Sequence, residues 1–212
     1  MSWLHRARNA AAPRAEEDTR GAAQDRTGAV LNGASSIVPL IGLSGYAQTG
    51  KDTAATHLAD YSFTRLAFAD PLRAAALAVN PYIDGYRHRL SDIVGPNGWE
   101  AAKRTPEVRA FLQRFGVAIR DIDPDFWVNA TMRRIEPGKR YVITDVRFPN
   151  EAQAIKARGG FVVRVHRPGV KAVNAHVSET ALDDWDFDAH LFNDGDADKY
   201  RVRVALLLEE LL

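Results

Sequence analysis

Several features are missing from this chain of 212 residues, and each absence excludes a class of protein. It contains no cysteine, which excludes disulfides, cysteine nucleophiles and zinc–thiolate sites and suits a reducing compartment such as the cytoplasm. No apolar run is long enough to span a membrane. The formal net charge of +1 supplies no basic field for a nucleic-acid polymer. The sequence therefore predicts a cytoplasmic protein with neither a membrane nor a nucleic-acid partner.

Residues 1–36 contain no run of large apolar residues of the kind that a packed core requires. They have no hydrophobic stretch of the kind a secretory signal needs, and their acidic residues argue against an organelle transit peptide. We predict a flexible N-terminal extension over 1–36, with at most a frayed helix. A single domain is then expected over 37–212, a length that suits one α/β core.

A glycine-rich stretch at residues 45–53 lies between a predicted strand at 37–43 and a predicted helix that begins at residue 53. Gly45 and Gly50 allow the backbone to wrap closely around a phosphate chain. The N–H groups between them, including those of Gln48 and Thr49, and the helix N-terminus provide positive potential, to which Lys51 adds a full charge. A strand-to-helix turn that binds nothing is the disfavoured alternative. This stretch predicts a binding site for a nucleoside triphosphate.

The residue after the lysine departs from the usual phosphate loop, which has Ser or Thr there to hold Mg²⁺. This chain has Asp52, followed by Thr53. A carboxylate is an acceptable hard oxygen ligand for Mg²⁺, so both residues are candidate metal ligands. Switch GTPases and motor ATPases depend on the hydroxyl, and the guanine-reading Asn-Lys-x-Asp motif is missing. The pattern favours a small-molecule kinase.

Strands and helices alternate along the rest of the domain. Strands are expected at 37–43, 63–68, 141–144, 161–165 and 191–192, and helices beginning at residues 53, 70, 105, 124, 150 and 197. Residues 81–104 are expected to form an irregular insertion, because they contain several Gly and Pro residues. The alternation predicts an α/β fold of the P-loop type, in which a mainly parallel sheet lies between two helical layers. The ligand should lie at the carboxyl ends of the strands.

Asp145 ends an apolar strand far downstream of the loop, as does the second acidic residue near Mg²⁺ in loop-type NTPases. Arg147 follows two residues later and can direct its guanidinium at a phosphate. The alternative is an aspartate that caps the next helix and an arginine on the surface. We favour a catalytic pair, because the loop already indicates a phosphate site nearby.

Basic and aromatic residues on the other elements leave several alternatives open. Arg73, Arg109, Arg114 and Arg120 are expected on helices after the second strand, where one or two of them could hold an acceptor phosphate. Trp127 and Phe126 could stack on a base, although core packing is the better interpretation of either one alone. Arg164, Arg167 and Lys171 lie where a strand leads into a loop, and predict either a basic lid over the triphosphate or a solvated turn.

Taken in order, the short motifs of this chain resemble those of the deoxynucleoside monophosphate kinases encoded by tailed bacteriophages. The matching pieces are residues 43–45 with 50–53, 66–73, 111–113 with 116, 125–128, 145–151, 165–169, 176–179 and 193–195. Gly-Lys-Asp-Thr alone is weakly specific, whereas the ordered set is strongly so.

This resemblance implies a nucleoside monophosphate kinase-like fold with a helical insertion that binds the acceptor. It implies ATP-dependent phosphorylation of deoxynucleoside 5′-monophosphates to diphosphates, which supplies deoxynucleoside triphosphates for phage DNA synthesis in the host cytoplasm. The ATP side would comprise Gly45, Gln48, Thr49, Gly50, Lys51, Asp52, Thr53, Arg167 and Asn193, with Asn193 near adenine. The acceptor side would comprise Asp70, Arg73, Arg109, Gln113, Trp127, Arg147 and Glu151. The catalytic residues would be Lys51, Asp145 and Arg147, and the Mg²⁺ ligands Asp52, Thr53 and Asp145.

The partners so implied are ATP, a deoxynucleoside monophosphate and Mg²⁺, and a homodimer is left open. Two other functions remain as alternatives. One is another P-loop small-molecule kinase, such as one acting on dephospho-coenzyme A. The other is a nucleotide-binding regulatory module without transferase activity, which would change its partner binding with nucleotide but transfer no phosphate.

Overall fold

The structure is a computed structural model that describes residues 39–83, 85, 87–95, 98–171 and 180–212. All of them belong to one compact unit, Ser35–Leu212. The extension predicted at 1–36 and the matching piece at 176–179 lie outside the described residues. Within the described part of the chain, no helix is both long and apolar enough to cross a membrane.

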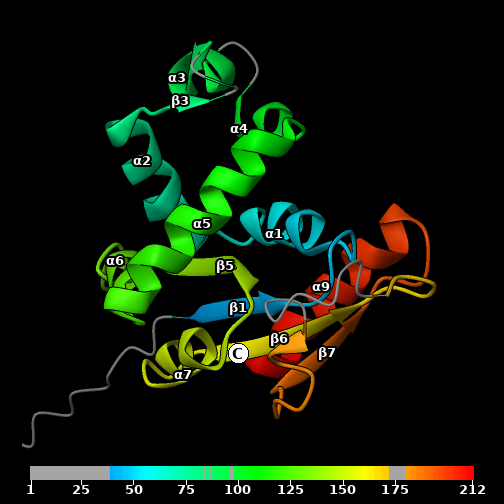
Figure 1. The fold of residues 1–212 in the computed structure, drawn as a ribbon. Coiled ribbons are helices and arrows are strands. Elements are labelled where there is room, and N and C mark those ends of the chain that lie inside the picture. Colours follow the sequence, from blue (N-terminus) through cyan, green and yellow to red (C-terminus); the bar gives the residue numbers. More distant parts are fainter. Residues whose placement is uncertain (1–38, 84, 86, 96–97, 172–179) are drawn as a thin grey trace, which may run out of the picture. The chain divides into compact units, whose positions relative to one another are not determined.

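The elements alternate along the chain as predicted (Figure 1). The strands of the main sheet are β1 (Leu40–Ser44), β2 (Phe63–Leu66), β5 (Arg140–Val146), β6 (Phe161–His166) and β7 (Ala189–Phe192). The helices that cover it are α1 (Lys51–Ala59), α6 (Phe126–Met132), α7 (Pro149–Lys156) and α9 (Ala197–Leu211). The remaining elements form an insertion, here called the arm: α2 (Ala69–Val79), β3 (Tyr82–Ile83), β4 (His88–Arg89), α3 (Leu90–Val94), α4 (Gly98–Ala102) and α5 (Pro106–Ile122).

The main sheet has the order β2-β5-β1-β6-β7, and each neighbouring pair in it is parallel. The strand that precedes the glycine-rich loop therefore lies in the middle, between β5 and β6. Leu40 pairs with Tyr141 of β5 on one side, and Leu43 pairs with Val163 of β6 on the other. Crossover connections diverge at such a central strand and leave a crevice at its carboxyl end. The predicted parallel α/β fold is confirmed.

Both faces of the sheet are buried, which explains why its strands are apolar almost throughout. Side chains alternate between the faces along each strand. Ile41 and Leu43 pack with α1 and α9 on one face, whereas Leu40 packs with α6 and α7 on the other. The two faces give the helix–sheet–helix layering that the sequence predicted.

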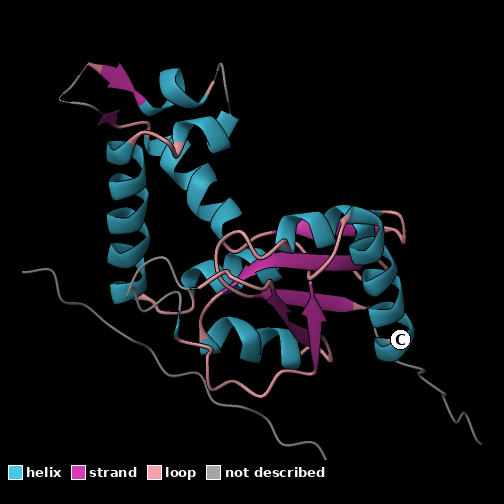
Figure 2. Ribbon diagram, turned by 90° about the vertical axis from the view of Figure 1, so that its right-hand side faces the viewer, coloured by secondary structure: helices cyan, strands magenta, loops and turns pink. Residues whose placement is uncertain are grey.

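The arm rises from the carboxyl edge of the sheet, with α2 and α5 as its two legs (Figures 1 and 2). It has an apolar core of its own, in which Ile83, Leu90 and Val94 pack against Val108 of α5. The expectation of irregular structure at 81–104 was wrong in part, since this stretch forms two short helices and a two-stranded hairpin. The few apolar residues of 81–104 become buried only because α2 and α5 pack against them.

Candidate functional site

The glycine-rich loop joins the buried strand β1 to the first turn of α1, and its backbone requires glycine. Gly45 and Gly50 have φ angles of 137° and 107°, in the left-handed region that side chains avoid. A Cβ atom at Gly45 would lie 2.5 Å from the carbonyl oxygen of Val165. A Cβ atom at Gly50 would lie 2.5 Å from Asn193 Nδ2. Neighbouring elements thus approach the loop closely at both glycines.

Lys51 is held over this loop by main-chain carbonyls. Its Nζ donates hydrogen bonds to the carbonyl oxygens of Gly45 and Tyr46, both at 2.6 Å. Thr49, which is 1% exposed, donates from Oγ1 to the Tyr46 carbonyl oxygen at 3.0 Å and braces the same turn. The ammonium group and the first N–H groups of α1 therefore lie at one concave loop, the arrangement that binds phosphate oxygens.

Side chains from the C-terminal part of the chain support the loop from the side. Asn193 Nδ2 donates to the Thr49 carbonyl oxygen at 3.0 Å, and the Tyr200 hydroxyl donates to the Gly50 carbonyl oxygen at 3.1 Å. Arg167 Nη1 donates to the Gln48 carbonyl oxygen at 3.4 Å. Burial raises the pKa of Tyr200, so its hydroxyl remains a donor. Sequence reasoning missed Tyr200, because nothing in a terminal helix marks one tyrosine as a partner of a distant loop.

Among the predicted Mg²⁺ ligands, Asp52 has the most accessible carboxylate. Its side chain is 82% exposed at the first turn of α1, with Oδ1 3.5 Å from Arg65 Nη2, and Thr53 beside it is also exposed. No cluster of three or more acidic or histidine ligands occurs among the described residues. Mg²⁺ in kinases is commonly held by one or two carboxylates with substrate phosphates and water. A single accessible carboxylate beside the loop fits that mode.

Asp145 is committed to the backbone of the arm. Its Oδ1 accepts from the Phe68 N–H at 2.7 Å and its Oδ2 from the Ala69 N–H at 3.0 Å, at the start of α2. Burial raises the pKa of this carboxyl, while the two N–H groups and the nearby charge of Arg147 oppose the rise. Asp145 therefore caps a helix 77 residues earlier in the chain rather than the next one. Its contact with a metal stays a prediction.

Glu151 is the most deeply buried acid of the site, at 1% exposure. Its Oε2 accepts from the Arg147 and Phe148 N–H groups at 2.8 and 3.1 Å, and its Oε1 accepts from Arg120 Nη2 at 2.8 Å. Burial and the charge of Asp145 raise the pKa of Glu151 to about 7, against the lowering effect of its hydrogen bonds and of Arg120. Arg147 itself is exposed at the turn between β5 and α7.

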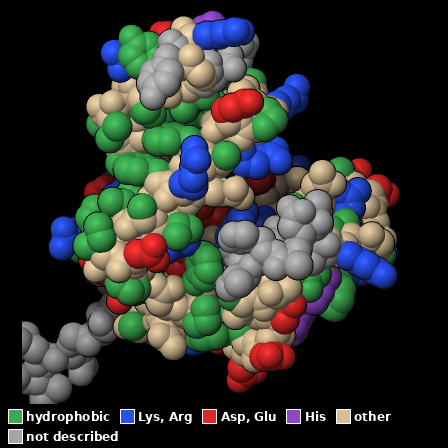
Figure 3. All heavy atoms as spheres, in the orientation of Figure 1, with side chains coloured by type: hydrophobic (Ala, Val, Ile, Leu, Met, Phe, Trp, Pro, Cys, Tyr) green, Lys and Arg blue, Asp and Glu red, His purple; other side chains and the backbone are tan. Residues whose placement is uncertain are grey.

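The structure brings together only some of the residues predicted for the acceptor side. Asp70 and Arg73 lie at the N-terminus of α2, with Asp70 Oδ1 3.6 Å from Arg73 Nη1. The charge of Asp70 raises the pKa of Asp145, so these two carboxylates lie near each other. Arg134, which sequence reasoning missed, approaches Asp70 Oδ2 at 3.7 Å. Acidic and basic side chains gather in the hollow between the arm and the sheet (Figure 3).

The other predicted acceptor residues are placed differently. Trp127 is 3% exposed and donates from Nε1 to the Gly116 carbonyl oxygen at 3.2 Å, so it packs α6 against α5. Arg109 is exposed on α5 and donates to the Lys103 carbonyl oxygen at 3.1 Å. Gln113 is exposed one turn further along α5. Direct contact of these three with an acceptor stays a prediction.

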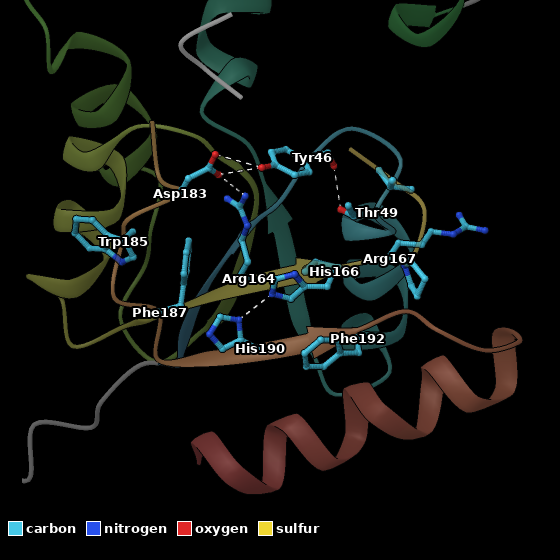
Figure 4. Close-up of a pocket in the computed structure, with 13 residues that line it drawn as sticks. Tyr46, Thr49, Arg164, His166, Arg167, Asp183, Trp185, Phe187, His190 and Phe192 are labelled. Carbon is cyan, nitrogen blue, oxygen red and sulfur yellow. Dashed lines mark hydrogen bonds and ion pairs between the residues drawn. The ribbon is translucent and has the colours of Figure 1, made fainter. Parts of the chain in front are cut away.

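Beside the loop is a cavity of about 640 Å³ whose walls carry flat rings (Figure 4). His166 of β6 stacks on Phe192 of β7 at 5.0 Å between ring centroids, and on His190 at 5.1 Å. His166 Nε2 and His190 Nδ1 are 2.8 Å apart and share a hydrogen bond. Burial, His190 and Arg164 lower the pKa of His166. Rings at alternate positions along β7, together with His166 of β6, were the available sequence signal for this row. The signal could be recognised only once the register of β6 against β7 was known.

Arg164 joins the cavity wall to the loop. It lies within β6 at 7% exposure, so neither a lid nor a solvated turn describes it. Its Nη2 forms an ion pair with Asp183 at 2.7 Å, and its guanidinium lies 4.9 Å from the Tyr46 ring centroid. The Tyr46 hydroxyl in turn donates to Asp183 Oδ2 at 3.2 Å. Figure 4 shows Arg164 pointing from the strand toward these two residues.

Comparisons with known proteins point to one family. The family model described as deoxynucleotide monophosphate kinase matches residues 98–204. A putative deoxynucleotide monophosphate kinase of Acanthamoeba polyphaga mimivirus is 34% identical over 167 residues, covering 68% of this chain and 81% of that protein. The deoxynucleotide monophosphate kinase of Enterobacteria phage T4 is 28% identical over 111 residues, covering 49% of this chain and 46% of that protein.

Likeness to solved structures is weaker. Shikimate kinase from Aquifex aeolicus matches with a TM-score of 0.46 and 12% identity, covering 81% of this chain and 96% of that one. The fold assignment therefore rests on the strand order and layering described above.

Proposed function

The chain belongs to the deoxynucleotide monophosphate kinase family, and from this we propose that it phosphorylates deoxynucleoside 5′-monophosphates to diphosphates with ATP as donor. One observation carries the proposal. The loop with Lys51 and the turn with Arg147 follow two adjacent parallel strands, so donor and acceptor phosphates can meet at one edge of the sheet. Such an activity would supply deoxynucleoside triphosphates for DNA synthesis in the cytoplasm.

On the donor side, the loop would bind the triphosphate. The N–H groups of residues 45–50, the N-terminus of α1 and Lys51 would surround its outer phosphates. Asp52 would hold Mg²⁺, Thr53 and Asp145 would be its further ligands, and the ion when bound would supply further neutralisation of charge. The ring-lined cavity beside Tyr46 and Thr49 suits the flat base of the same nucleotide, with Arg167 and Asn193 at its margin.

On the acceptor side, the start of α2 and the turn after β5 would hold the monophosphate. Arg73 lies 3.6 Å from Asp70, the charge of Arg147 acts on Asp145, and a guanidinium fork can bind two phosphate oxygens at once. Gln113 and Arg109 are exposed on α5 and would contact the base or sugar. Glu151 and Trp127 would contribute by holding the turn and the helices in place.

The chemistry requires positioning rather than a general base, because the acceptor phosphate oxygen is already anionic at neutral pH. That oxygen attacks the terminal phosphorus of the donor, the bond to the bridging oxygen breaks, and ADP leaves. Lys51 and Arg147 would stabilise the charge that develops on the transferring group. Closure of the arm over the loop would exclude water, which would otherwise hydrolyse ATP in the absence of acceptor.

A coupled ADP-release assay over the four deoxynucleoside monophosphates and their ribose counterparts tests this function. We expect ADP release that requires Mg²⁺ and at least one deoxynucleoside monophosphate. The matched control is Lys51→Ala, which should lower the rate on the order of 10² to 10³-fold or more, because it removes an electrostatic contact to the phosphates. Transfer only to dephospho-coenzyme A, or nucleotide binding without transfer to any acceptor, would refute the proposal in favour of its alternatives.

A further inference from the structure

Two acids that flank the turn between β5 and α7, the partly buried Asp145 and the buried Glu151, tie this turn to both legs of the arm. Asp145 accepts hydrogen bonds from the first residues of α2, and Glu151 accepts one from Arg120 near the end of α5. Arg147, which is exposed, lies between these acids in the sequence. Both legs of the arm are therefore linked to the turn that carries Arg147.

The contact to α5 is a closely fitted ion pair. Glu151 has a side-chain exposure of 2%, and the Arg120 guanidinium reaches it at 2.8 Å while lying 4.3 Å from the Phe148 ring centroid. The other carboxylate oxygen of Glu151 accepts the N–H groups of Arg147 and Phe148. Glu151 thus has the α5 cation on one oxygen and the backbone of the Arg147 turn on the other.

A second contact fixes the same end of α5 to the same turn. Asn150 Nδ2 donates to the Pro124 carbonyl oxygen at 3.1 Å and to Asp125 Oδ1 at 2.8 Å, in the segment that follows α5. Because these hydrogen bonds of Asn150 already attach the end of α5 to the turn, the Arg120–Glu151 ion pair adds little to that attachment. A buried ion pair is also weak support for stability, because the cost of removing both charges from water offsets their attraction. A role in orientation accounts better for its geometry.

We propose that Arg120 is a positioning residue, whose ion pair with Glu151 makes the end of α5 and the Arg147 turn move as one unit. The inference rests on the proposed kinase activity for its catalytic meaning. The Arg120 guanidinium is bound to Glu151 and stacked on Phe148. Arg120 therefore acts on the reaction through Arg147 rather than directly on the acceptor phosphate. Displacing a reacting group by about 1 Å can lower the rate about 10²-fold. A loss of the Arg120–Glu151 ion pair that shifts Arg147 should therefore have a measurable effect on kcat.

A double-mutant cycle on kcat at pH 8, where Glu151 is ionised, tests this coupling. Arg147→Lys should lower kcat about 100-fold in the otherwise unchanged protein, because the lysine cannot reproduce the guanidinium fork. Arg120→Gln should lower kcat about 10- to 100-fold while KM for ATP stays within about twofold. Because both changes act through one group, Arg147→Lys should cost less than about tenfold in the Arg120→Gln background. Multiplicative effects, or a folded Arg120→Gln protein with the kcat of the parent, would overturn the proposal.

The matched control is Arg201→Gln, which breaks an exposed ion pair of 2.9 Å between α9 and Asp60 and should leave kcat unchanged. If Arg120→Gln does not fold, Arg120→Lys keeps the charge, loses the flat stack on Phe148, and should show a smaller loss of the same kind.

A measurement without catalysis separates this inference from the proposed function. Amide hydrogen exchange of the segment 145–151 should be at least about tenfold faster in Arg120→Gln than in the parent or in Arg201→Gln, because the Arg147 and Phe148 N–H groups lose a firmly held acceptor. Unchanged exchange would overturn the positioning role even in an active enzyme. A parent protein that transfers phosphate to no deoxynucleoside monophosphate would refute the proposed function instead, while the exchange result would still decide the coupling.

Discussion

Asp52 shows at the scale of one residue how a departure from a common motif changes the expected metal site. Its carboxylate is exposed at the first turn of α1, where the general motif has a hydroxyl. We expect Asp52→Ser to remain active but to require a different Mg²⁺ concentration, because the serine restores a hydroxyl ligand and removes a negative charge. Initial rates over a series of Mg²⁺ concentrations at saturating ATP measure this. Identical rates and an identical Mg²⁺ response would show that Asp52 is not near the metal.

Glu151 predicts a dependence of stability on pH. Its pKa is raised from 4.5 to about 7 by burial and by Asp145, so the folded protein keeps a proton that the unfolded chain has released in this range. The contribution of Glu151 to the free energy of unfolding is fully present below about pH 4.5, decreases as the pH rises, and is lost above about pH 7.

Glu151→Gln is the comparison that isolates this term, since Asp145 and Arg120 remain in both proteins. Between pH 4.5 and 7, we expect the parent to lose on the order of 1 to 3 kcal/mol relative to the variant. Urea unfolding at several pH values across this range measures the difference. A difference that stays constant, or that grows in favour of the parent with rising pH, would contradict the raised pKa.

At the scale of elements, Trp127 decides how α5 and α6 hold together. The indole is buried and donates to the Gly116 carbonyl oxygen. Trp127→Phe should lower the free energy of unfolding by about 1 to 3 kcal/mol, because it removes a buried hydrogen bond and part of the packed volume. KM for the monophosphate should stay within about twofold. Denaturant unfolding and steady-state kinetics together separate packing from a direct contact with the acceptor.

The neighbouring Phe126 provides the control for this prediction. It is 45% exposed and meets the Trp127 ring edge-on at 4.8 Å, so Phe126→Leu should change stability by less than about 1 kcal/mol. If Trp127→Phe instead raises KM for the monophosphate more than about tenfold with stability intact, the indole contacts the acceptor, as the resemblance to phage kinases implies.

At the scale of the whole molecule, the compact unit Ser35–Leu212 contains the loop, the arm and the sheet. A shortened protein that begins at Ser35 should keep the melting temperature of the full chain within about 2 °C and keep its kcat, because residues 1–34 lack the apolar content for a packed core. Thermal unfolding and the ADP-release assay on both proteins measure this. A lower melting temperature or a lost activity would show that the preceding residues stabilise the domain.

The sequence was sufficient for features that depend on neighbouring residues. The glycines and Lys51 of the loop act through backbone conformation within one turn, so their spacing alone predicted the tight loop between β1 and α1. Phosphate binding by this loop stays a prediction. The apolar strands and the alternation with helices likewise predicted the parallel sheet. Element ends were less certain. The second strand stops at Leu66 rather than at residue 68, because the N–H groups of Phe68 and Ala69 bind a carboxylate from a distant strand.

Tertiary structure alone decided which side chains meet. Asp145 caps α2, Asn193 and Tyr200 support the loop from 144 and 150 residues away, and Arg120 pairs with Glu151. The row of rings in the cavity depends on the register of β6 against β7. The physical reason is that local pattern determines backbone conformation and which face of an element is apolar, whereas the direction and partner of a polar side chain are set only when separate elements pack.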